Sequence, residues 1–370
     1  MKVFLLYPYF FSPDGKQKKI GGVETYIESL ADVIVGLGLT PIVCQFSEKP
    51  FERSYLNYVV RGYGVKTIKK LYKSIESDID KHSDLIIFVS DLWSIRVKDV
   101  KTLSIQHGIY WDIPRNQGPY ILYYCQRVKQ VLKALIDFNK TRYSVCVDYN
   151  FYNWYKTFNV KLKCKKHWII PNFANQCISK SELNQKITSR SSRINIIFAR
   201  RFYEFRGVNI FTEAMLRIMQ EYPCVNVTFA GEGPGEKYIR DCFAAYENRF
   251  SVIKYAPSES FEVHKKFDIA VVPTIGSEGT SLSLLEAMGA GCIAISTPVG
   301  GLSNIIIDEY NGYITMPASD DLYMTIKKAI DNINNTQIVM HAVDSVKSSF
   351  SKEKWSIAWR NVLKYIMQAE

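Results

Sequence analysis

The sequence predicts an α/β protein made of two successive parallel sheets. Short apolar runs rich in β-branched residues alternate with longer helical patterns, which is typical of βαβ units. The same series starts a second time near residue 190, after a polar stretch. With 370 residues, of which 47% are hydrophobic and 22% charged, the chain is long and apolar enough to bury two cores. This composition excludes disordered and coiled-coil classes.

Six candidate strands precede the polar stretch. The first, over residues 3–7, is a short apolar run that ends at Pro8, and a helix is expected after it over residues 23–35. This run is too short for a signal-peptide core or a membrane span, and no later run reaches the ~18 apolar residues that a span needs. The chain is therefore expected to be cytoplasmic, with at most a peripheral contact to a membrane. The other five strands are expected over residues 41–46, 85–89, 102–106, 144–147 and 167–170.

The polar stretch of residues 171–193 is interpreted as a linker that contains a short helix. A helix is expected after the first strand of the second series, over residues 208–220. The last segment, residues 351–367, carries Trp355 and Trp359 in an apolar pattern of helical spacing, which predicts a packed amphipathic helix. The strands of the second series are expected over residues 194–199, 226–230, 251–254, 269–273 and 292–296.

We therefore expect a first Rossmann-like domain over residues 1–175, joined by a final helix of about residues 351–370, and a second over residues 190–350. Two doubly wound sheets joined by a linker imply a cleft lined by loops at the carboxyl ends of the strands, where ligands bind in this architecture.

The net charge of +11 is uneven. Residues 1–175 hold 26 Lys and Arg against 15 Asp and Glu, whereas residues 176–370 hold 21 of each. This excess favours an anionic partner for the first domain, such as a phospholipid surface, a lipid diphosphate or nucleic acid. A surface kept soluble by its charge is the alternative. The densest cluster of lysines is Lys161–Lys166.

The arrangement of the eight cysteines argues against a metal site built on cysteine. They are scattered without a Cys-x-x-Cys pair, so neither a zinc site nor a redox motif is expected.

Two glycine-rich loops follow predicted strands. Gly21-Gly22 lies at the start of the first helix, where an anion could approach unpaired N–H groups, although a plain strand-to-helix turn is the alternative. Gly231-Glu232-Gly233-Pro234-Gly235 follows the strand over residues 226–230. Neither loop has the spacing of a dinucleotide fingerprint or a Walker A motif, which disfavours hydride transfer and ATP hydrolysis.

Arginines gather on one predicted strand-to-helix loop. Arg200-Arg201 ends the strand over residues 194–199, and Arg206 precedes the next helix. Guanidinium groups facing a cleft suit a diphosphate, because they stay charged and form forked hydrogen bonds to phosphate oxygens. A solvated surface pair is the alternative.

The strongest pattern covers residues 273–288. A strand leads into a loop that carries Glu278, and Thr280 or Ser281 caps the following helix, which carries Glu286. The N–H groups around Gly279 could face an anion. Glu286 lies among leucines and a methionine, where an unpaired carboxylate is costly to bury. It should therefore accept hydrogen bonds, either from ribose hydroxyls or, as a core acid, from N–H groups or an arginine.

Taken together, these residues resemble the retaining nucleotide-sugar glycosyltransferases of family 4, which have the GT-B fold. The two glutamates with seven residues between them, in their strand-loop-helix setting, are the most specific element. The resemblance spans nearly the whole chain. It rests on Gly21-Gly22-Val23-Glu24-Thr25, His107-Gly108, Pro171-Asn172, Arg201 with Arg206-Gly207, Gly231-Glu232-Gly233-Pro234, Glu278 with Glu286, and Val299-Gly300-Gly301.

The resemblance implies an acceptor-binding first domain, a donor-binding second domain and a final helix that returns to the first. It implies that Glu278 contacts the donor sugar, Arg201 and Arg206 the diphosphate, and Glu286 the ribose. His107 would face the sugar from the acceptor domain, although taken alone it is an ordinary strand-end histidine. The implied donor-binding residues are Gly22, Gly231, Gly233, Gly279, Thr280, Ser281, Leu282 and Glu286.

The chain departs from the family pattern at two points. The family usually has lysine at the position of Arg206, which keeps the charge but changes its geometry. It commonly has Phe-Gly at the position of Thr280-Ser281, so the wall beside the sugar differs and the identity of the donor is in doubt.

The implied activity is retaining transfer of a hexosyl residue from a UDP- or GDP-sugar to a glycan. The expected acceptor is a lipid-linked oligosaccharide of bacterial O-antigen or capsule synthesis, and no metal, cofactor or nucleic-acid partner is expected. Two alternatives stay open. A nucleotide-sugar epimerase on the same fold would interconvert donors, and a non-catalytic lipid or polynucleotide binder would show steep salt dependence without turnover.

Overall fold

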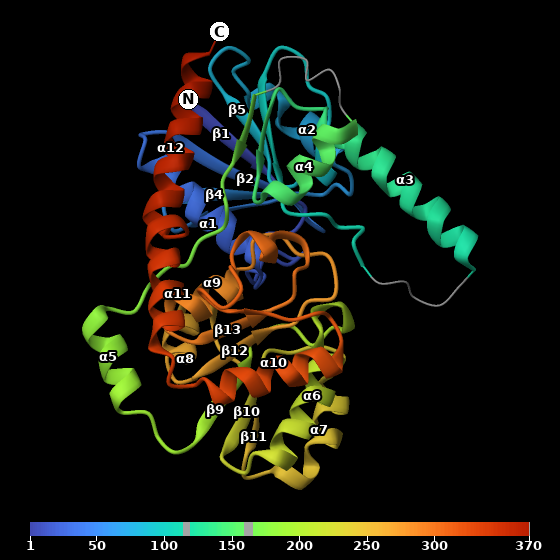
Figure 1. The fold of residues 1–370 in the computed structure, drawn as a ribbon. Coiled ribbons are helices and arrows are strands. Elements are labelled where there is room, and N and C mark those ends of the chain that lie inside the picture. Colours follow the sequence, from blue (N-terminus) through green and yellow to red (C-terminus); the bar gives the residue numbers. More distant parts are fainter. Residues whose placement is uncertain (114–118, 159–165, 370) are drawn as a thin grey trace. The chain divides into compact units, whose positions relative to one another are not determined.

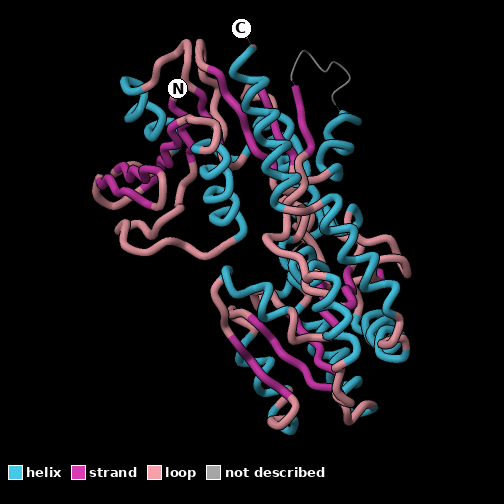
Figure 2. The backbone as a smooth tube through the Cα atoms, turned by 90° about the vertical axis from the view of Figure 1, so that its left-hand side faces the viewer, coloured by secondary structure: helices cyan, strands magenta, loops and turns pink. Residues whose placement is uncertain are grey.

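A computed structural model describes residues 1–113, 119–158 and 166–369 and divides the chain into two compact units. Unit 1 comprises Met1–His107, Gln117–Ile170 and Trp355–Glu370, and unit 2 comprises Gly108–Asn116 and Pro171–Lys354. Each unit has its own sheet with helices packed against it (Figures 1 and 2). The predicted α/β class with two sheets is confirmed. The predicted cluster Lys161–Lys166 lies outside the described residues except for Lys166.

Unit 1 contains an eight-stranded sheet in the order β3-β4-β2-β1-β5-β6-β7-β8. Every neighbouring pair is parallel except β3 with β4. The strands predicted from apolar runs are confirmed to within one residue at each end. They are β1 (Lys2–Leu6), β2 (Thr40–Phe46), β5 (Leu85–Phe88), β6 (Lys101–Gln106), β7 (Tyr143–Cys146) and β8 (Lys166–Ile169).

A hairpin of β3 (Phe51–Tyr55) and β4 (Tyr58–Tyr63) was not predicted. β3 exposes its three central residues, so it lacks the apolar run by which a buried strand is found. The turn also lacks a glycine signal, because Leu56 takes the positive φ of 49°.

The helices of unit 1 include the last helix of the chain, which the tryptophan spacing predicts. From Trp355 onward this helix belongs to unit 1. Its Trp359 is fully buried and donates a hydrogen bond from Nε1 to the hydroxyl of Tyr26 at 2.9 Å. The helices are α1 (Gly22–Val35), α2 (Ile68–Ile75), α3 (Tyr120–Phe138), α4 (Tyr149–Phe158) and α12 (Lys352–Gln368).

Unit 2 contains a six-stranded parallel sheet in the order β11-β10-β9-β12-β13-β14. Five of its strands were predicted to within one residue, and the two-residue edge strand β14 was not. The strands are β9 (Ile194–Phe198), β10 (Val225–Ala230), β11 (Phe250–Ile253), β12 (Ile269–Val272), β13 (Ile293–Ser296) and β14 (Tyr313–Ile314). β9 and β12 are neighbours at the centre of the sheet, although β10 and β11 lie between them in the sequence.

Helices cover the sheet of unit 2, and the short helix expected in the linker is present. Ser179 caps it in a capping box with Glu182. Phe198, Phe211 and Phe229 are fully buried in one core of this unit. The helices are α5 (Lys180–Thr188), α6 (Val208–Glu221), α7 (Glu236–Cys242), α8 (Ser260–His264), α9 (Leu282–Gly289), α10 (Ser319–Asp331) and α11 (Thr336–Ser349).

Within the described ranges, no helix combines the length and the apolar character that crossing a bilayer requires.

Candidate active site

The loops that leave the central strands of unit 2 are joined to each other. Because β9 and β12 are parallel neighbours, the loops after them start at the same edge of the sheet. The N–H of Ile275 donates to the carbonyl of Phe205 at 2.9 Å. Gly207 has a φ of +82°, and a Cβ there would lie 1.8 Å from the carbonyl oxygen of Pro273. Only glycine therefore fits between these two loops.

The carboxylate of Glu278 is shared by two arginines. Its Oε2 accepts hydrogen bonds from Arg200 Nη2 and from Arg206 Nη1, the second at 2.5 Å. The hydroxyl of Thr274 donates to the same oxygen at 3.1 Å. The side chains of Arg200, Arg206 and Glu278 are 8%, 16% and 10% exposed, so this charged group is largely withdrawn from water.

The electrostatics of this group favour a bound anion. Burial alone would raise the pKa of Glu278, but the charges of Arg200 and Arg206 outweigh it and hold the pKa below its ordinary value. Burial lowers the pKa of Arg200 to about 10, even though Glu278 opposes the shift. At neutral pH two cations thus face one carboxylate. Such a buried excess of positive charge is well suited to bind a diphosphate.

The loop after β13 supports Glu278 through its backbone. Gly301 donates its N–H to the carbonyl of Glu278 at 3.1 Å. A Cβ at Gly300 would lie 2.0 Å from the same oxygen. Ser277, just before Glu278, takes a φ of 56°, which a non-glycine residue adopts only when its surroundings hold it there. The motif Val299-Gly300-Gly301 therefore packs closely against the backbone of Glu278 and helps to hold it in place.

The glycines after β10 pack against the backbone that carries Arg200. A Cβ at Gly231 would lie 2.3 Å from the carbonyl oxygen of Arg200, and one at Gly233 would lie 2.8 Å from the nitrogen of Phe202. The N–H of Phe202 donates to the carbonyl of Glu232 at 2.9 Å. Gly231 and Gly233 thus allow the backbone that follows β9 to pack closely against their loop. Their contact with a donor stays a prediction.

The start of α9 lies beside the arginines. Ser281 caps the helix by accepting from the N–H of Leu284 at 3.5 Å, and Arg200 Nη1 donates to the same hydroxyl at 3.3 Å. Thr280 is buried, and its carbonyl accepts from Asn172 Nδ2 at 2.6 Å.

Gly279 and Leu282 flank Thr280-Ser281 and have different surroundings. A Cβ at Gly108, whose φ is +111°, would lie 2.8 Å from the nitrogen of Gly279, so the two backbones are in close contact. Leu282 is the first residue of α9 and is partly exposed.

Glu286 belongs to a second polar group. Its Oε2 accepts from the hydroxyl of Ser260 at 2.7 Å. Burial raises its pKa to about 7, and the hydrogen bond from Ser260 opposes this shift. Burial raises the pKa of Tyr255 to about 12, with the charge of Glu286 adding to the shift and that of Arg200 reducing it. Glu286, Ser260, Tyr255 and Arg200 are therefore within electrostatic reach of one another.

The sequence pattern grouped Arg200, Arg201 and Arg206 for a diphosphate, and the resemblance named Arg201 with Arg206. Ser260 and Tyr255 were not singled out from the sequence. The last two residues follow β11, so the rule that loops after parallel strands carry ligands could have found them. Arg201 does not reach Glu278. It is exposed, with its guanidinium 5.6 Å from the ring of Tyr203, and the adjacent Arg200 makes the contact instead.

Two predicted site residues lie in unit 1. Gly22 is the first residue of α1. His107 follows β6, with Nε2 2.7 Å from the carbonyl oxygen of Val89. Since a carbonyl only accepts, Nε2 carries the proton and Nδ1 is the acceptor nitrogen. Burial lowers the pKa of His107 to about 4, so the ring is neutral at physiological pH.

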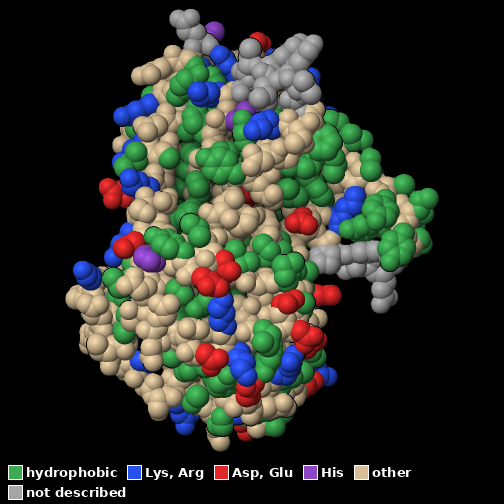
Figure 3. All heavy atoms as spheres, viewed as in Figure 1, with side chains coloured by type: hydrophobic (Ala, Val, Ile, Leu, Met, Phe, Trp, Pro, Cys, Tyr) green, Lys and Arg blue, Asp and Glu red, His purple; other side chains and the backbone are tan. Residues whose placement is uncertain are grey.

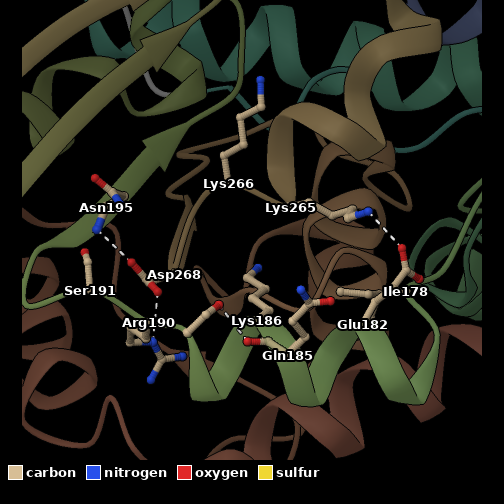
Figure 4. Close-up of a pocket in the computed structure, with 11 residues that line it drawn as sticks. Ile178, Glu182, Gln185, Lys186, Arg190, Ser191, Asn195, Lys265, Lys266 and Asp268 are labelled. Carbon is tan, nitrogen blue, oxygen red and sulfur yellow. Dashed lines mark hydrogen bonds and ion pairs between the residues drawn. The ribbon is translucent and has the colours of Figure 1, made fainter.

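A cavity of about 410 Å³ in unit 2 lies elsewhere (Figure 4). It is lined by α5 and by residues at the starts of β9 and β12, such as Asn195 and Asp268, which is the opposite end of these strands from Glu278. Its charges are largely paired, Arg190 with Asp268 and Lys265 with Glu182. We therefore do not assign it to the donor. Among the described residues, no three His, Cys, Asp or Glu side chains gather in a way that could hold a metal ion.

Residues 193–332 match the family model described as "Glycosyl transferases group 1". A glycogen synthase from Thermodesulfovibrio yellowstonii is 29% identical over 168 residues, which cover 44% of this chain and 32% of the relative. One component of the human phosphatidylinositol N-acetylglucosaminyltransferase is 20% identical over 95% of this chain and 72% of its own length. The chain spans less than two thirds of the length of the curated relatives that it matches first.

The fold is shared with solved glycosyltransferase structures. The crystal structure of Anabaena HepE in complex with UDP-glucose has a TM-score of 0.69 to this chain, with 15% sequence identity, and covers 99% of this chain and 100% of its own. This likeness confirms the predicted GT-B fold, and the family match over residues 193–332 agrees with the resemblance to nucleotide-sugar glycosyltransferases that the motifs predict.

Proposed function

From the GT-B fold and the group 1 glycosyl transferase match over residues 193–332, we propose that this chain transfers a hexosyl residue from a nucleotide-diphosphate sugar to a glycan, with retention of configuration. The observation that carries the proposal is the Glu278 carboxylate shared by Arg200 and Arg206 at the carboxyl edge of a parallel sheet. UDP is the proposed nucleotide, because the similar HepE structure is a complex with UDP-glucose, and GDP is the alternative.

The difficult step is the loss of the leaving group. Breaking the bond between the anomeric carbon and the phosphate oxygen leaves new negative charge on the diphosphate and oxocarbenium character on the sugar. Arg200 and Arg206 would stabilise this charge with guanidinium groups that the protein already holds in place. Losing one such contact typically costs about 3 to 4 kcal/mol of barrier. In this proposal the arginines supply the charge that a divalent metal supplies elsewhere.

The two glutamates would bind different parts of the donor. Glu278 is ionised and can accept from a hydroxyl of the sugar while it keeps both guanidinium groups aligned. Glu286 already accepts from one hydroxyl, that of Ser260, and a ribose can offer it further hydroxyl donors. Tyr255, held within reach of both Glu286 and Arg200, would lie close to the nucleoside.

Retention would follow from a same-face substitution. The bond from the anomeric carbon to the phosphate oxygen breaks, the bond to the acceptor oxygen forms on the same face, and the departing phosphate oxygen takes the acceptor's proton. This chemistry needs no protein nucleophile and no dedicated base. His107 is neutral with Nδ1 as its acceptor nitrogen, which suits a hydrogen bond from a sugar hydroxyl.

The proposed acceptor is a lipid-linked oligosaccharide of bacterial O-antigen or capsule synthesis. The support is the charge, since the excess of Lys and Arg lies in residues 1–175, the half proposed to bind the acceptor. The name of the human relative, which is similar over most of this chain, also includes a lipid, phosphatidylinositol.

A panel of UDP- and GDP-sugars, incubated with and without lipid-linked glycan acceptors, tests the proposal. We expect nucleotide release that requires an acceptor, and a product whose anomeric proton coupling in NMR matches that of the donor. Interconversion of donors without an acceptor would indicate an epimerase, and a fully inert panel in which the protein still binds lipid would indicate a non-catalytic binder. Inverted product would contradict retention.

A further inference from the structure

Helix α3 of unit 1 carries an exposed apolar side. Five large apolar side chains, each more than half exposed, recur at spacings of three and four residues along it. At 3.6 residues per turn this spacing places them in one stripe. They are Ile121, Tyr124, Val128, Leu132 and Ile136. A surface helix of a globular protein ordinarily buries such a stripe, so the exposed stripe requires a partner.

The opposite side of α3 is the one that packs on unit 1. Ala134, Asp137 and Phe138 are buried, and they lie about half a turn away from Leu132 on the helix. Asp137 forms ion pairs with Lys133 and Lys140, which fixes the C-terminal end of the helix. The N-terminal part extends away from the sheet of its unit (Figure 1). The orientation of the stripe is therefore set by the packing of the helix.

The charges on α3 match an anionic surface. Apart from the buried Asp137, the charged residues within the helix are Arg127, Lys129 and Lys133, all basic. Lys129 and Lys133 lie along one border of the stripe and Arg127 lies along the other, as the helical spacing requires. Figure 3 shows hydrophobic side chains gathered over this helix, with basic side chains beside them. Long basic side chains can extend their charges to lipid headgroups while their stems lie on apolar surface.

We propose that α3 docks on an anionic lipid bilayer, with the stripe in the headgroup region and Arg127 and Lys129 at the phosphates. An interfacial helix of this kind needs an apolar face and basic flanks rather than a length that spans the bilayer, and α3 has both. Basic residues near the surface of an anionic bilayer are attracted to its headgroups. The inference adds to the proposed function by naming α3 as the element that contacts the membrane in which a lipid-linked acceptor would lie. The evidence for it comes from α3 alone.

Flotation of the intact protein with vesicles tests the proposal. We expect the wild type to bind vesicles of phosphatidylcholine with about 30% phosphatidylglycerol, to bind pure phosphatidylcholine at least tenfold less, and to detach as salt rises. The double variant Val128→Ser with Leu132→Ser should lose at least tenfold in vesicle binding, and Lys129→Glu should lose several-fold. The matched control, Leu56→Ser with Ile307→Ser, changes two comparably exposed apolar residues elsewhere and should bind like the wild type.

Two further measurements keep the outcomes distinct. Light scattering after size exclusion tells whether the stripe joins two copies of the chain, and a dimer that dissociates in the Val128→Ser, Leu132→Ser variant would overturn the proposal. So would vesicle binding that this variant retains in full. Urea unfolding followed by circular dichroism, measured on the same samples, verifies folding. Failure of sugar transfer with intact vesicle binding would contradict the proposed function and leave the docking of α3 standing.

Discussion

Arg206 Nη1 lies 2.5 Å from the Oε2 atom of Glu278, although the two residues are 72 positions apart in the sequence. Arg206 ends the loop after β9, and Glu278 lies in the loop after the neighbouring strand β12. Their pairing is therefore a product of the strand order, which places two distant loops side by side. Arg200 shares the same carboxylate oxygen.

Replacing either arginine should slow transfer strongly. Arg206→Ala or Arg200→Ala removes one preorganised donor from the leaving diphosphate, and we expect kcat/KM to fall about 100- to 1000-fold, as for the loss of one oxyanion contact. Steady-state kinetics with a saturating acceptor measures this. Arg193→Ala, which removes an exposed guanidinium of the same unit, serves as the matched control and should stay within twofold of the wild type. Near-normal transfer by Arg206→Ala counts against the assignment.

Stability should depend on pH through Glu286. Burial raises its pKa from 4.5 to about 7, so between these values the folded chain keeps a proton that the unfolded chain has released. This contribution to stability is fully present below pH 4.5 and is lost as the pH rises through 7. Glu286→Gln cannot ionise, so its free energy of unfolding should fall less than that of the wild type between pH 5 and pH 8. Urea unfolding at both values measures the difference.

The exposed Glu247→Gln variant is the control for this experiment and should follow the wild type. If Glu286→Gln also followed the wild type at both pH values, the carboxylate would not be carrying the predicted proton.

The last helix should contribute stability through one buried hydrogen bond. Trp359→Phe removes the Nε1 donor to Tyr26 and part of a fully buried ring, so we expect a loss of about 1 to 3 kcal/mol in the free energy of unfolding. Urea denaturation reports the loss, and Lys364→Ala on the exposed side of α12 should change it little. An unchanged midpoint for Trp359→Phe would show that this contact adds nothing to stability.

Chelation should leave transfer intact. In the proposed mechanism the diphosphate is stabilised by guanidinium groups, so an excess of EDTA should not change the initial rate measured by nucleotide release. Loss of activity that is restored by a divalent cation would assign part of this task to a metal.

Much of the fold could be predicted because buried parallel strands are continuous apolar runs. This signal placed β1, β2 and the central strands of unit 2 to within one residue. The hairpin of β3 and β4 was not predicted from apolar runs, because β3 is exposed and Leu56 occupies a turn position where glycine is usual. Motif order alone also singled out the loop of residues 273–288, in which the structure joins Glu278 to Arg200 and Arg206, and its contact with a donor stays a prediction.

Other features of the site depend on three-dimensional packing. Arg200 and Arg201 are adjacent and chemically identical, and only the path of the backbone at the end of β9 turns Arg200 toward Glu278. Ser260 and Glu286 meet because α8 packs against α9, which no local pattern indicates. The outward stripe of α3 has the periodicity of a helix that packs on a core, so its exposure could not be predicted from the sequence.

Calorimetric titration of uridine and UDP into the wild type and into the Arg200→Ala, Arg206→Ala double variant tests the central claim most directly. If these two arginines hold the diphosphate, the wild type binds UDP at least tenfold more tightly than uridine, and the double variant loses this preference while its uridine affinity is unchanged. If the double variant still prefers UDP over uridine as strongly as the wild type does, the diphosphate is bound elsewhere and the account is wrong. The same conclusion follows if the double variant keeps the wild type's preference for GDP over guanosine.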